Sequence, residues 1–349
     1  MKTAVIRVDA SIEIGTGHVM RCLTLAEELH DDSYDVTFIT SDHEGHLADF
    51  IQSKGFQVIK LKKPSKENSI KEELQHSHWL GTSQEVDAKD VLHAIAELPT
   101  INLMVVDHYA IDYRWELIIK DRAKKMFVID DLADRYHHCD LLLDQNFYLD
   151  MEKRYEGLVD KHCTLLLGPK YALLRKEFKE AEKKLKVRSG DIQRILVFFG
   201  GSDPTNETKK AIKAIEKIDK KKIFVDVVVG ASNPNKDQVE TLVNKFPNMI
   251  YHCQVSNMSE LMLNADLAIG AGGSATWERC YLGLPAITIG VAYNQMEILR
   301  AVEKSGAIIN LGYSSHVSIE NLVEQIKSLL SNNNTLKQMS IQSSKLISH

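Results

Sequence analysis

The chain has 349 residues, of which 44% are hydrophobic and 26% are charged, as in ordinary globular proteins. Its 43 Lys and Arg residues against 48 Asp and Glu residues give a net charge of −5, which argues against a general binder of nucleic acid or anionic membranes. This length predicts two domains, each large enough to bury its own core.

The first half of the chain alternates short apolar runs with amphipathic segments. The apolar runs predict strands, and the segments with apolar residues at helical spacing predict the helices between them. In chain order we expect strands at 3–8, 35–40, 56–61, 101–109, 126–133 and 139–146, and helices at 18–30, 46–55, 85–98 and 113–125. This alternation is typical of a parallel sheet covered by helices on both faces.

The alternation pauses at 171–191, a lysine-rich segment without a strand signal, and then resumes. The second series predicts strands at 194–201, 223–230, 249–254, 266–273 and 285–291, with helices at 206–218, 237–245, 258–265 and 274–283. We therefore expect an N-terminal domain (1–175), a linker (176–191), a C-terminal domain (192–330) and a helical tail (331–349). In such sheets ligands bind beyond the carboxyl ends of the strands.

Two glycine-rich turns follow strands of the second domain, "FFGGSDPTN" and "AIGAGGSATWE". Small residues let backbone N–H groups approach a phosphate closely, and the start of the next helix adds a favourable dipole. Either turn alone is more often a tight turn without a ligand, but two in one domain favour a diphosphate. Neither fits the P-loop or the dinucleotide fingerprint.

The first strand ends in another glycine turn, "GTGH", which places His18 at the start of a helix. A histidine there lies at the positive end of the helix dipole, which favours the neutral imidazole, a competent base near pH 7. The alternative is a structural histidine bonded to a nearby carbonyl, and without further information that reading is the better one.

Several motifs taken together resemble one family. The segments 270–295 ("GAGGSATWERCYLGLPAITIGVAYNQ"), 199–206 ("FGGSDPTN") and 15–29 ("GTGHVMRCLTLAEEL") are similar to the UDP-sugar hydrolases of pseudaminic acid biosynthesis, the PseG family. "VVDHYAID", "VIDDLADRYHHCDLLLDQN" and "GPKYALLRKEF" also match, so the resemblance runs from the first strand to about Gln295. The motifs taken together are specific for this family, whereas no single motif is.

The resemblance implies the α/β fold called GT-B, shared with the MurG-type glycosyltransferases, in which two Rossmann-like domains face each other across a cleft. It implies hydrolysis of UDP-2,4-diacetamido-2,4,6-trideoxy-β-L-altropyranose to UDP and the free sugar, in pseudaminic acid or related surface polysaccharide biosynthesis. The enzyme is expected to need neither a metal nor a cofactor, and its partner is a small UDP-sugar.

The family pattern assigns the UDP site to the C-terminal domain. Glu278 would bond the ribose, although a glutamate in the first turns of a helix is also a common partner of the dipole. Ala275 stands where many relatives have threonine, which removes a hydroxyl and leaves the backbone cradle. The remaining contacts to phosphate or sugar implied by the resemblance are Gly201, Ser202, Gly272, Gly273, Ser274, Asn294 and Gln295.

The resemblance makes His18 the base that activates water, and its neighbours are candidates for supporting roles. Asp9 would orient the imidazole or hold a sugar hydroxyl, and Gly15 and Gly17 would admit the sugar. Arg21, three residues after His18, would reach the diphosphate, or is an ordinary surface cation. The candidates for binding the acetamido sugar, weighed against polar strand-end turns, are Asp107, His108, Tyr109, Gln145 and Asn146.

The five cysteines are scattered without a C-x-x-C pair, which argues against a disulfide framework or a zinc site and favours a reducing compartment. The histidine pairs at 43–46, 76–78 and 137–138 lack a third ligand at suitable spacing and are read as surface residues. With no apolar stretch near bilayer length and no signal-peptide pattern, a cytoplasmic protein is expected. Nothing indicates oligomerisation, and the chain is compatible with a monomer.

Two other functions compete with the hydrolase. A GT-B glycosyltransferase would use the same UDP site and pass the sugar to an acceptor, but the apolar or basic patch usual in membrane-associated transferases is not evident here. A non-catalytic nucleotide-sugar binding protein is the third possibility, and a histidine at the helix start speaks against it only weakly.

Overall fold

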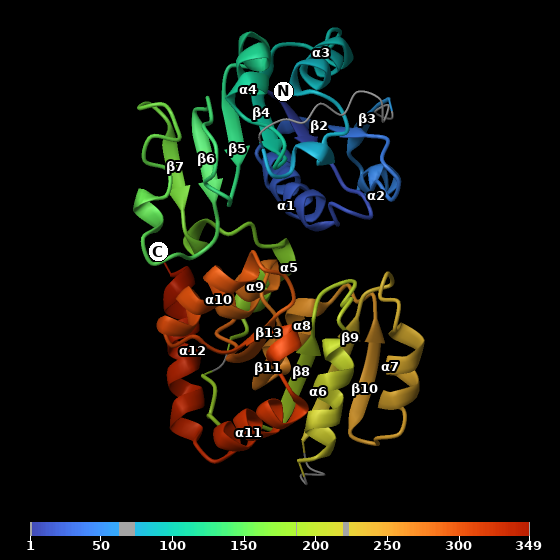
Figure 1. Cartoon of the computed structure of the whole chain (residues 1–349), viewed down its shortest axis with the longest axis vertical. Helices are drawn as coiled ribbons and strands as arrows, with labels where there is room; N and C mark the ends of the chain where they lie inside the picture. The colour runs from blue at the N-terminus through green and yellow to red at the C-terminus, as the bar shows by residue number, and fades with distance from the viewer. Residues whose placement is uncertain (1, 63–73, 186, 219–222, 349) are drawn as a thin grey trace. The chain divides into compact units, whose positions relative to one another are not determined.

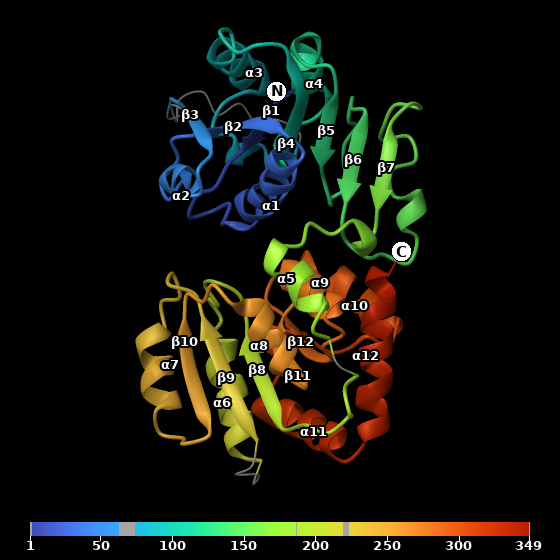
Figure 2. The ribbon, with the colours of Figure 1, turned by 180° about the vertical axis from the view of Figure 1, so that it is seen from behind.

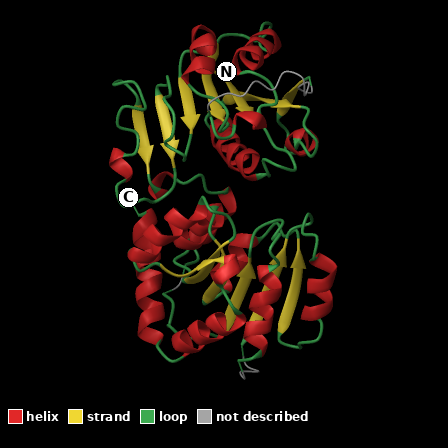
Figure 3. Ribbon diagram, in the orientation of Figure 1, coloured by secondary structure: helices red, strands yellow, loops and turns green. Residues whose placement is uncertain are grey.

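The computed structural model describes residues 2–62, 74–185, 187–218 and 223–348, which form two compact units. Unit 1 comprises Met1–Asn146 and Asp150–Leu173, and unit 2 comprises Phe147–Leu149 and Leu174–His349. Each unit is an open parallel sheet with helices on its faces (Figures 1 and 3), as the alternating sequence pattern predicts.

The sheet of unit 1 has seven strands in the order β3-β2-β1-β4-β5-β6-β7. The strands are β1 (Lys2–Val8), β2 (Tyr34–Ser41), β3 (Gln57–Leu61), β4 (Ile101–Asp107), β5 (Met126–Ile129), β6 (Leu141–Asp144) and β7 (Thr164–Leu167). The helices are α1 (Gly17–Asp31), α2 (Ala48–Ser53), α3 (Gln84–Ala94) and α4 (Tyr113–Ile119), with 3-10 turns η2 (Ser77–Trp79), η3 (Lys120–Arg122), η4 (Met151–Lys153) and η5 (Pro169–Tyr171). The edge strand β7 was not expected, because its four residues follow a polar stretch that masks the short apolar run.

The two faces of this sheet bury different sets of side chains, because successive strand residues point to opposite sides. Ala4, Ile6 and Val8 of β1 join the core under α1 and α2, whereas Val5 joins the core under α3 and α4. Figures 1 and 2 show these helix pairs on opposite faces of the sheet. Alternate residues of β1 and β4 therefore face different helices, one set α1 and α2 and the other α3 and α4.

The sheet of unit 2 has six strands in the order β10-β9-β8-β11-β12-β13. The strands are β8 (Arg194–Phe198), β9 (Phe224–Val229), β10 (Met249–Cys253), β11 (Leu267–Ala271), β12 (Ala286–Gly290) and β13 (Ile308–Tyr313). The helices are α5 (Lys176–Glu182), α6 (Glu207–Glu216), α7 (Lys236–Val243), α8 (Met258–Asn264), α9 (Ser274–Tyr281), α10 (Gln295–Lys304), α11 (Ile319–Leu330) and α12 (Asn333–Ile347), with the 3-10 turn η6 (Ser314–His316).

Two segments expected outside the second domain are built into unit 2. The expected linker contains α5, which packs against α8 and α9 through buried Phe178 and Ala181. The expected tail contains α12, which packs against α9 and α11. Ser340 donates to the carbonyl oxygen of Gly283 at 2.7 Å and Ser343 to that of Ala307 at 3.1 Å. The C-terminal helix thus packs within unit 2.

Both sheets have a point where the strand order reverses. In unit 1 it lies between β1 and β4, and in unit 2 between β8 and β11. Neighbouring loops there run to opposite faces of the sheet and leave a crevice at the carboxyl ends of the strands. The turn before His18 follows β1, and the turns at 199–206 and 270–274 follow β8 and β11. Among the described residues, no helix is both long and apolar enough to cross a bilayer.

A fully buried arginine anchors β1 to α3. Arg7 donates to Asp9 at 2.6 and 2.9 Å and to Asp87 of α3 at 2.6 and 3.2 Å. Asp87 also accepts from the indole N–H of Trp115 in α4 at 2.8 Å. Burial alone would raise the pKa of Asp9, but the charge of Arg7 together with hydrogen bonds from His108 and His43 outweighs it and holds that pKa well below its usual value.

Replacing Arg7 by Met is expected to lower the stability of unit 1 by about 3–5 kcal/mol at neutral pH, because two buried carboxylates lose their counter-charge. Since the folded pKa of Asp9 is depressed, this contribution is present above pH 4 or so and fades as the pH falls through the folded pKa. Denaturant unfolding at pH 7 and at acidic pH checks both statements. An equal loss at all pH values would contradict the electrostatic explanation.

Candidate active site

A histidine–aspartate pair lies at the reversal point of the unit 1 sheet. His18 is the second residue of α1, and Asp107 is the last residue of β4. Nδ1 of His18 lies 2.6 Å from Oδ1 of Asp107, whose side chain is fully buried. Because a carboxylate only accepts, Nδ1 carries the proton. In the described part of the chain Nε2 has no hydrogen-bond partner, so its lone pair is available to accept a proton.

Arg21 binds the same carboxylate from one turn further along α1. Its Nε and Nη2 each lie 2.6 Å from an oxygen of Asp107, and its Nη1 lies 3.1 Å from Asp131. Burial would raise the pKa of Asp107, but the charges of Arg21 and His18 lower it well below the usual range. Asp107 is therefore ionised at neutral pH and fixes the proton of the imidazole on Nδ1.

This geometry changes the role expected for Arg21. Its side chain is only 10% exposed and is held by Asp107 and Asp131. It is therefore not an ordinary surface cation, and its reach to a diphosphate stays a prediction. The guanidinium instead fixes the carboxylate that orients His18.

Asp131, which follows β5, connects further candidates to this pair. The hydroxyl of Tyr109 donates to Oδ1 of Asp131, and the amide of Asn146 donates to Oδ2 at 3.1 Å. The Tyr109 ring lies edge-on to the imidazole of His18, with ring centres 4.6 Å apart. The structure therefore brings together His18, Arg21, Asp107, Tyr109 and Asn146, all of which were sequence candidates, around Asp131, which was not.

An aromatic side chain that the sequence did not single out also lies here. Trp79, in the turn η2, stacks on Tyr109 with ring centres 5.6 Å apart and planes at 22°. Its indole is also edge-on to His18 at 6.3 Å. An aromatic wall beside a base can pack against apolar atoms of a sugar. Trp79 follows "HSH" in a segment without periodicity, so no sequence signal points to it.

Asp144, the last residue of β6, is a second acid that sequence reasoning missed. It accepts from the backbone N–H of Asn146 at 3.0 Å and from the Tyr155 hydroxyl at 3.2 Å. Burial, together with the charge of Asp131, raises its pKa to about 7. Through its bond to the backbone N–H of Asn146, the carboxyl group of Asp144 holds the loop that carries Asn146.

Two candidates lie on the opposite face of the sheet from His18. Asp9 accepts from Arg7 and from the backbone N–H of Ser41 at 2.7 Å. Nε2 of His108 lies 3.3 Å from Asp9, and its Nδ1 accepts from the N–H of Ala110. Both belong to the buried cluster around Arg7. This corrects the expectation that Asp9 orients His18, a position held by Asp107, and it separates His108 from the candidate site.

Gln145 also serves the fold, since it is buried and its side-chain oxygen accepts from the N–H of Leu173 at 3.2 Å. Gly15 has φ +79°, a conformation that favours glycine, and its N–H donates to the Ser11 carbonyl. Among the described residues beyond each glycine's immediate chain neighbours, no atom lies within 4 Å of a Cβ built on Gly15 or on Gly17. The backbone before His18 is thus open to a close approach.

The histidine pairs read from the sequence as surface residues divide in the structure. His137 is buried, and its Nδ1 lies 2.7 Å from Glu116. His78 is exposed and lies 2.8 Å from Glu13. Among the described residues no group of three His, Cys, Asp or Glu side chains is arranged to hold a metal ion.

The turn after β11 in unit 2 combines glycines with a helix start. A Cβ on Gly272 would lie 2.7 Å from Cγ of Leu299, so this position requires glycine for packing against α10. Gly273 has φ +157° and precedes Ser274, the first residue of α9. The first N–H groups of a helix have no partner within it, and they point toward the turn. This arrangement can bind an anion.

The turn after β8 exposes Gly201 and Ser202. Asp203 is buried below them and accepts from the N–H groups of Glu207 and Thr208, each at 2.9 Å. This aspartate caps α6 and fixes the turn, with Gly200 at φ +91°. The candidate backbone contacts therefore lie on a rigid support.

Glu278 points from α9 to an arginine that the sequence did not connect with it. Nε and Nη2 of Arg175 lie 3.0 and 2.8 Å from Oε1 of Glu278. Burial raises the pKa of Glu278, and the charge of Arg175 opposes that rise. Gln295 accepts from the N–H of Val291 at 3.1 Å, and its amide nitrogen would lie 3.9 Å from a Cβ on Gly273. Asn294, just before α10, is exposed.

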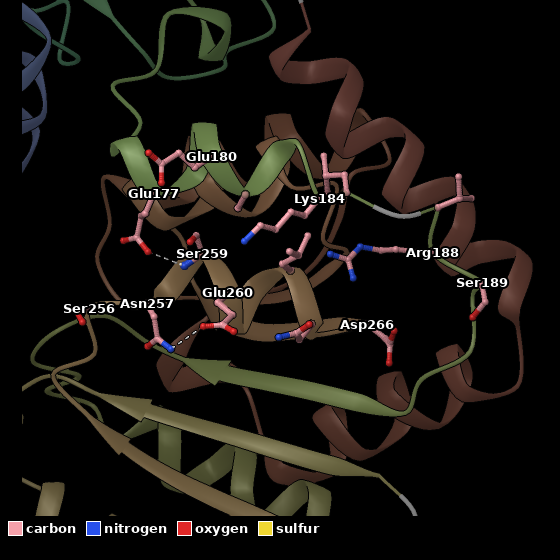
Figure 4. A pocket seen from close by; sticks show the side chains of 15 residues that line it. Glu177, Glu180, Lys184, Arg188, Ser189, Ser256, Asn257, Ser259, Glu260 and Asp266 are labelled. Atoms are coloured by element: carbon pink, nitrogen blue, oxygen red, sulfur yellow. Dashed lines mark hydrogen bonds between the residues drawn. The ribbon is translucent and has the colours of Figure 1, made fainter. Parts of the chain in front are cut away.

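A separate cavity of about 740 Å³ lies between α5, α8 and the segment 187–189 (Figure 4). Acidic and basic side chains line it, including Glu180, Lys184 and Asp266. None of the candidate residues from the sequence contributes to its lining. The cavity is therefore no part of the candidate site.

Comparison with solved structures identifies the class of fold to which the chain belongs. The crystal structure of MurG from Acinetobacter baumannii superposes with a TM-score of 0.66 at 11% identity, covering 99% of this chain and 95% of that one. The chain thus has the expected GT-B fold, with two Rossmann-like units. Residues 195–348 match the Glycosyltransferase family 28 C-terminal domain.

The sequence is similar to three relatives of different origin. It is 27% identical, over 88% of this chain and 98% of the relative, to the UDP-2,4-diacetamido-2,4,6-trideoxy-beta-L-altropyranose hydrolase of Campylobacter jejuni. It is 26% identical to the spore coat polysaccharide biosynthesis protein SpsG of Bacillus subtilis, over 93% of this chain and 87% of that protein. It is 28% identical over 83% of its length to an uncharacterized protein of Methanocaldococcus jannaschii, of which it spans only 55%. The resemblance drawn from the motifs is confirmed.

Proposed function

We propose that the chain hydrolyses a UDP-2,4-diacetamido-2,4,6-trideoxyhexose, the β-L-altropyranose being the expected sugar, to UDP and the free sugar. The observation that carries the proposal is the pair His18–Asp107, 2.6 Å apart, at the start of a helix preceded by an open glycine turn. The similarity to the Campylobacter jejuni hydrolase supports the substrate class. The proposal includes a cytoplasmic location and a role in nonulosonic acid or related polysaccharide biosynthesis.

The proposed reaction needs a water molecule and no covalent intermediate. The water oxygen bonds to the anomeric carbon while its proton passes to Nε2 of His18. The bond from the anomeric carbon to the phosphate oxygen breaks, and UDP leaves with the electron pair. Asp107 is already ionised and bonded to Nδ1, so it stabilises the imidazolium that forms. The charge on the leaving diphosphate is met by the turns at 199–206 and 270–274, and no metal is required.

A GT-B glycosyltransferase is the second candidate, favoured by the match of residues 195–348 to a glycosyltransferase domain. In that case His18 would deprotonate an acceptor hydroxyl instead of water. The decisive experiment incubates the purified chain with the UDP-diacetamido-trideoxyhexose and EDTA, without an acceptor. Release of UDP and free sugar supports the hydrolase. Turnover only after an acceptor is added supports the transferase, and UDP-sugar binding without turnover indicates a binding protein.

Replacing Glu278 by Ala is expected to weaken UDP binding roughly tenfold, the effect of losing a charge-assisted pair of hydrogen bonds to the ribose. Calorimetric titration with UDP measures it. Glu177→Ala is the matched control, because Glu177 is the other carboxylate bonded to Arg175, at 2.7 Å. Unchanged affinity in Glu278→Ala, or an equal loss in both variants, would contradict the ribose contact.

A further inference from the structure

The guanidinium groups of two arginines, Arg279 and Arg188, lie near the two ends of helix α9. Arg279 is only 2% exposed, and its side chain runs back along the helix toward the turn at 270–274. Its Nη2 donates to the carbonyl oxygen of Ala271 at 2.8 Å and to Oγ1 of Thr276 at 3.1 Å. Its Nη1 would lie 2.9 Å from a Cβ built on Gly270. The guanidinium thus lies directly beneath the glycine turn.

The charge of Arg279 is not neutralised by its own surroundings. Within the described ranges no carboxylate lies at ion-pair distance from it, and its buried Nε has no hydrogen-bond partner. The neighbouring carboxylate, Glu278, acts on it only through space and is itself bonded to Arg175. Burial lowers the pKa of Arg279 to about 10, so the group is still charged at neutral pH. A buried cation without a partner carries a large desolvation cost.

Arg188, which Figure 4 labels, shows how a partly buried arginine is accommodated at the C-terminal end of α9. It donates to the carbonyl oxygens of Leu282 and Gly283 after α9 and of Met262 and Ala265 at the end of α8. Helix C-termini carry partial negative charge, so a cation is stabilised there. Arg279 belongs to the last turn of α9, but its guanidinium reaches back to Ala271 and Thr276 at the N-terminal end, where the dipole is positive and a cation is unfavourable. An anion bound at the same turn would offset this cost.

We propose that Arg279 is the buried counter-charge of the diphosphate that binds at the turn 270–274, an inference that rests on the proposed function of this chain. Its guanidinium sits below the backbone, too deep to touch the ligand. Its positive charge attracts the phosphates across the turn, and its hydrogen bonds hold Ala271 and Thr276 in place. It is thus a positioning residue that raises the affinity of the site for the charged part of UDP and not for the nucleoside.

The test compares UDP with uridine, which lacks the phosphates, by calorimetric titration of the full chain and of Arg279→Gln. A unit charge one layer below the phosphates predicts a loss in UDP affinity of roughly tenfold. The affinity for uridine should stay the same. Arg279→Lys, which keeps the charge, is expected to keep most of the UDP affinity. Arg188→Gln is the matched control, since it removes a partly buried guanidinium at the C-terminal end of α9, away from the turn, and should weaken neither ligand.

Two results would overturn the role of Arg279 without touching the proposed function. One is an unchanged UDP affinity in Arg279→Gln, and the other is an equal loss of UDP and uridine affinity, which marks a structural role. If Arg279→Gln does not fold, Arg279→Lys serves as the test instead. An equal loss of UDP affinity and uridine affinity in Arg279→Lys would likewise mark a structural role. Failure of the unaltered chain to bind UDP at all would instead reject the proposed UDP site and this inference with it.

Discussion

His18→Asn is expected to release UDP from the diacetamido sugar roughly a thousandfold more slowly than the unaltered chain, because a positioned general base contributes about 10²–10⁴ to such reactions. Asparagine retains a polar side chain near Asp107 but cannot accept a proton. Since His18 belongs to unit 1 and is bonded to Asp107 and Arg21 of that unit, whereas the proposed UDP contacts belong to unit 2, the affinity for UDP should be nearly unchanged.

The measurement is a steady-state assay of UDP release together with a UDP titration. His30→Asn is the matched control, because it makes the same change on an exposed residue at the far end of α1. A rate near that of the unaltered chain in His18→Asn would reject His18 as the base. A loss of UDP affinity parallel to the loss of rate would point to a disturbed fold.

Asp107→Asn should produce the second-largest effect, a fall in kcat of about 10²–10⁴, by analogy with the removal of the carboxylate that orients a catalytic histidine. The amide no longer fixes the proton on Nδ1 and no longer offsets the positive charge that develops on the ring. Arg21 would also lose one of the two bonds of 2.6 Å that join α1 to the end of β4, because an amide has only one acceptor oxygen.

A positioning role and a structural role differ in how kcat and KM respond. If Asp107 acts through His18, kcat falls while KM stays nearly constant. Asp9→Asn is the matched control, because Asp9 is an equally buried carboxylate bonded to an arginine, but on the face of the sheet away from His18. That variant is expected to lose stability and to keep the kcat of its folded fraction. Equal losses of kcat in both variants would reject the assignment of Asp107.

The alternation of strands and helices predicted both sheets, because fully buried parallel strands leave continuous apolar runs in the sequence. The boundaries of the units were less well predicted. The lysine-rich α5 looked like a linker, since only Phe178 and Ala181 of its seven residues are buried. The tail at 331–349 was expected to be helical, but its apolar residues do not show which elements it packs against; in the structure these are α9 and α11.

In the candidate site, the sequence led to His18 and to the strand ends but paired them wrongly. Asp9 is close to His18 in the chain, and this proximity favoured it over Asp107. The two-residue period of β1 was a signal that could have corrected this, because Val8 faces α1 and Asp9 therefore faces away from it. By the same rule Asp107 and His108 separate to opposite faces. Long-range partners such as Asp131 and Trp79 left no comparable trace, since their contacts depend on the packing of distant loops.

The bonds from Asp107 to His18 and Arg21 have a consequence for protein engineering. They fix the first two turns of α1 to the central strand β4, so the position of His18 does not depend on the preceding loop at 11–16. That loop has few bonds to the rest of unit 1, such as the backbone bond from Ile12 to Glu44. A designer can therefore vary its length and side chains to accept other sugars while the chemistry stays in place, which separates the choice of substrate from the machinery that acts on it.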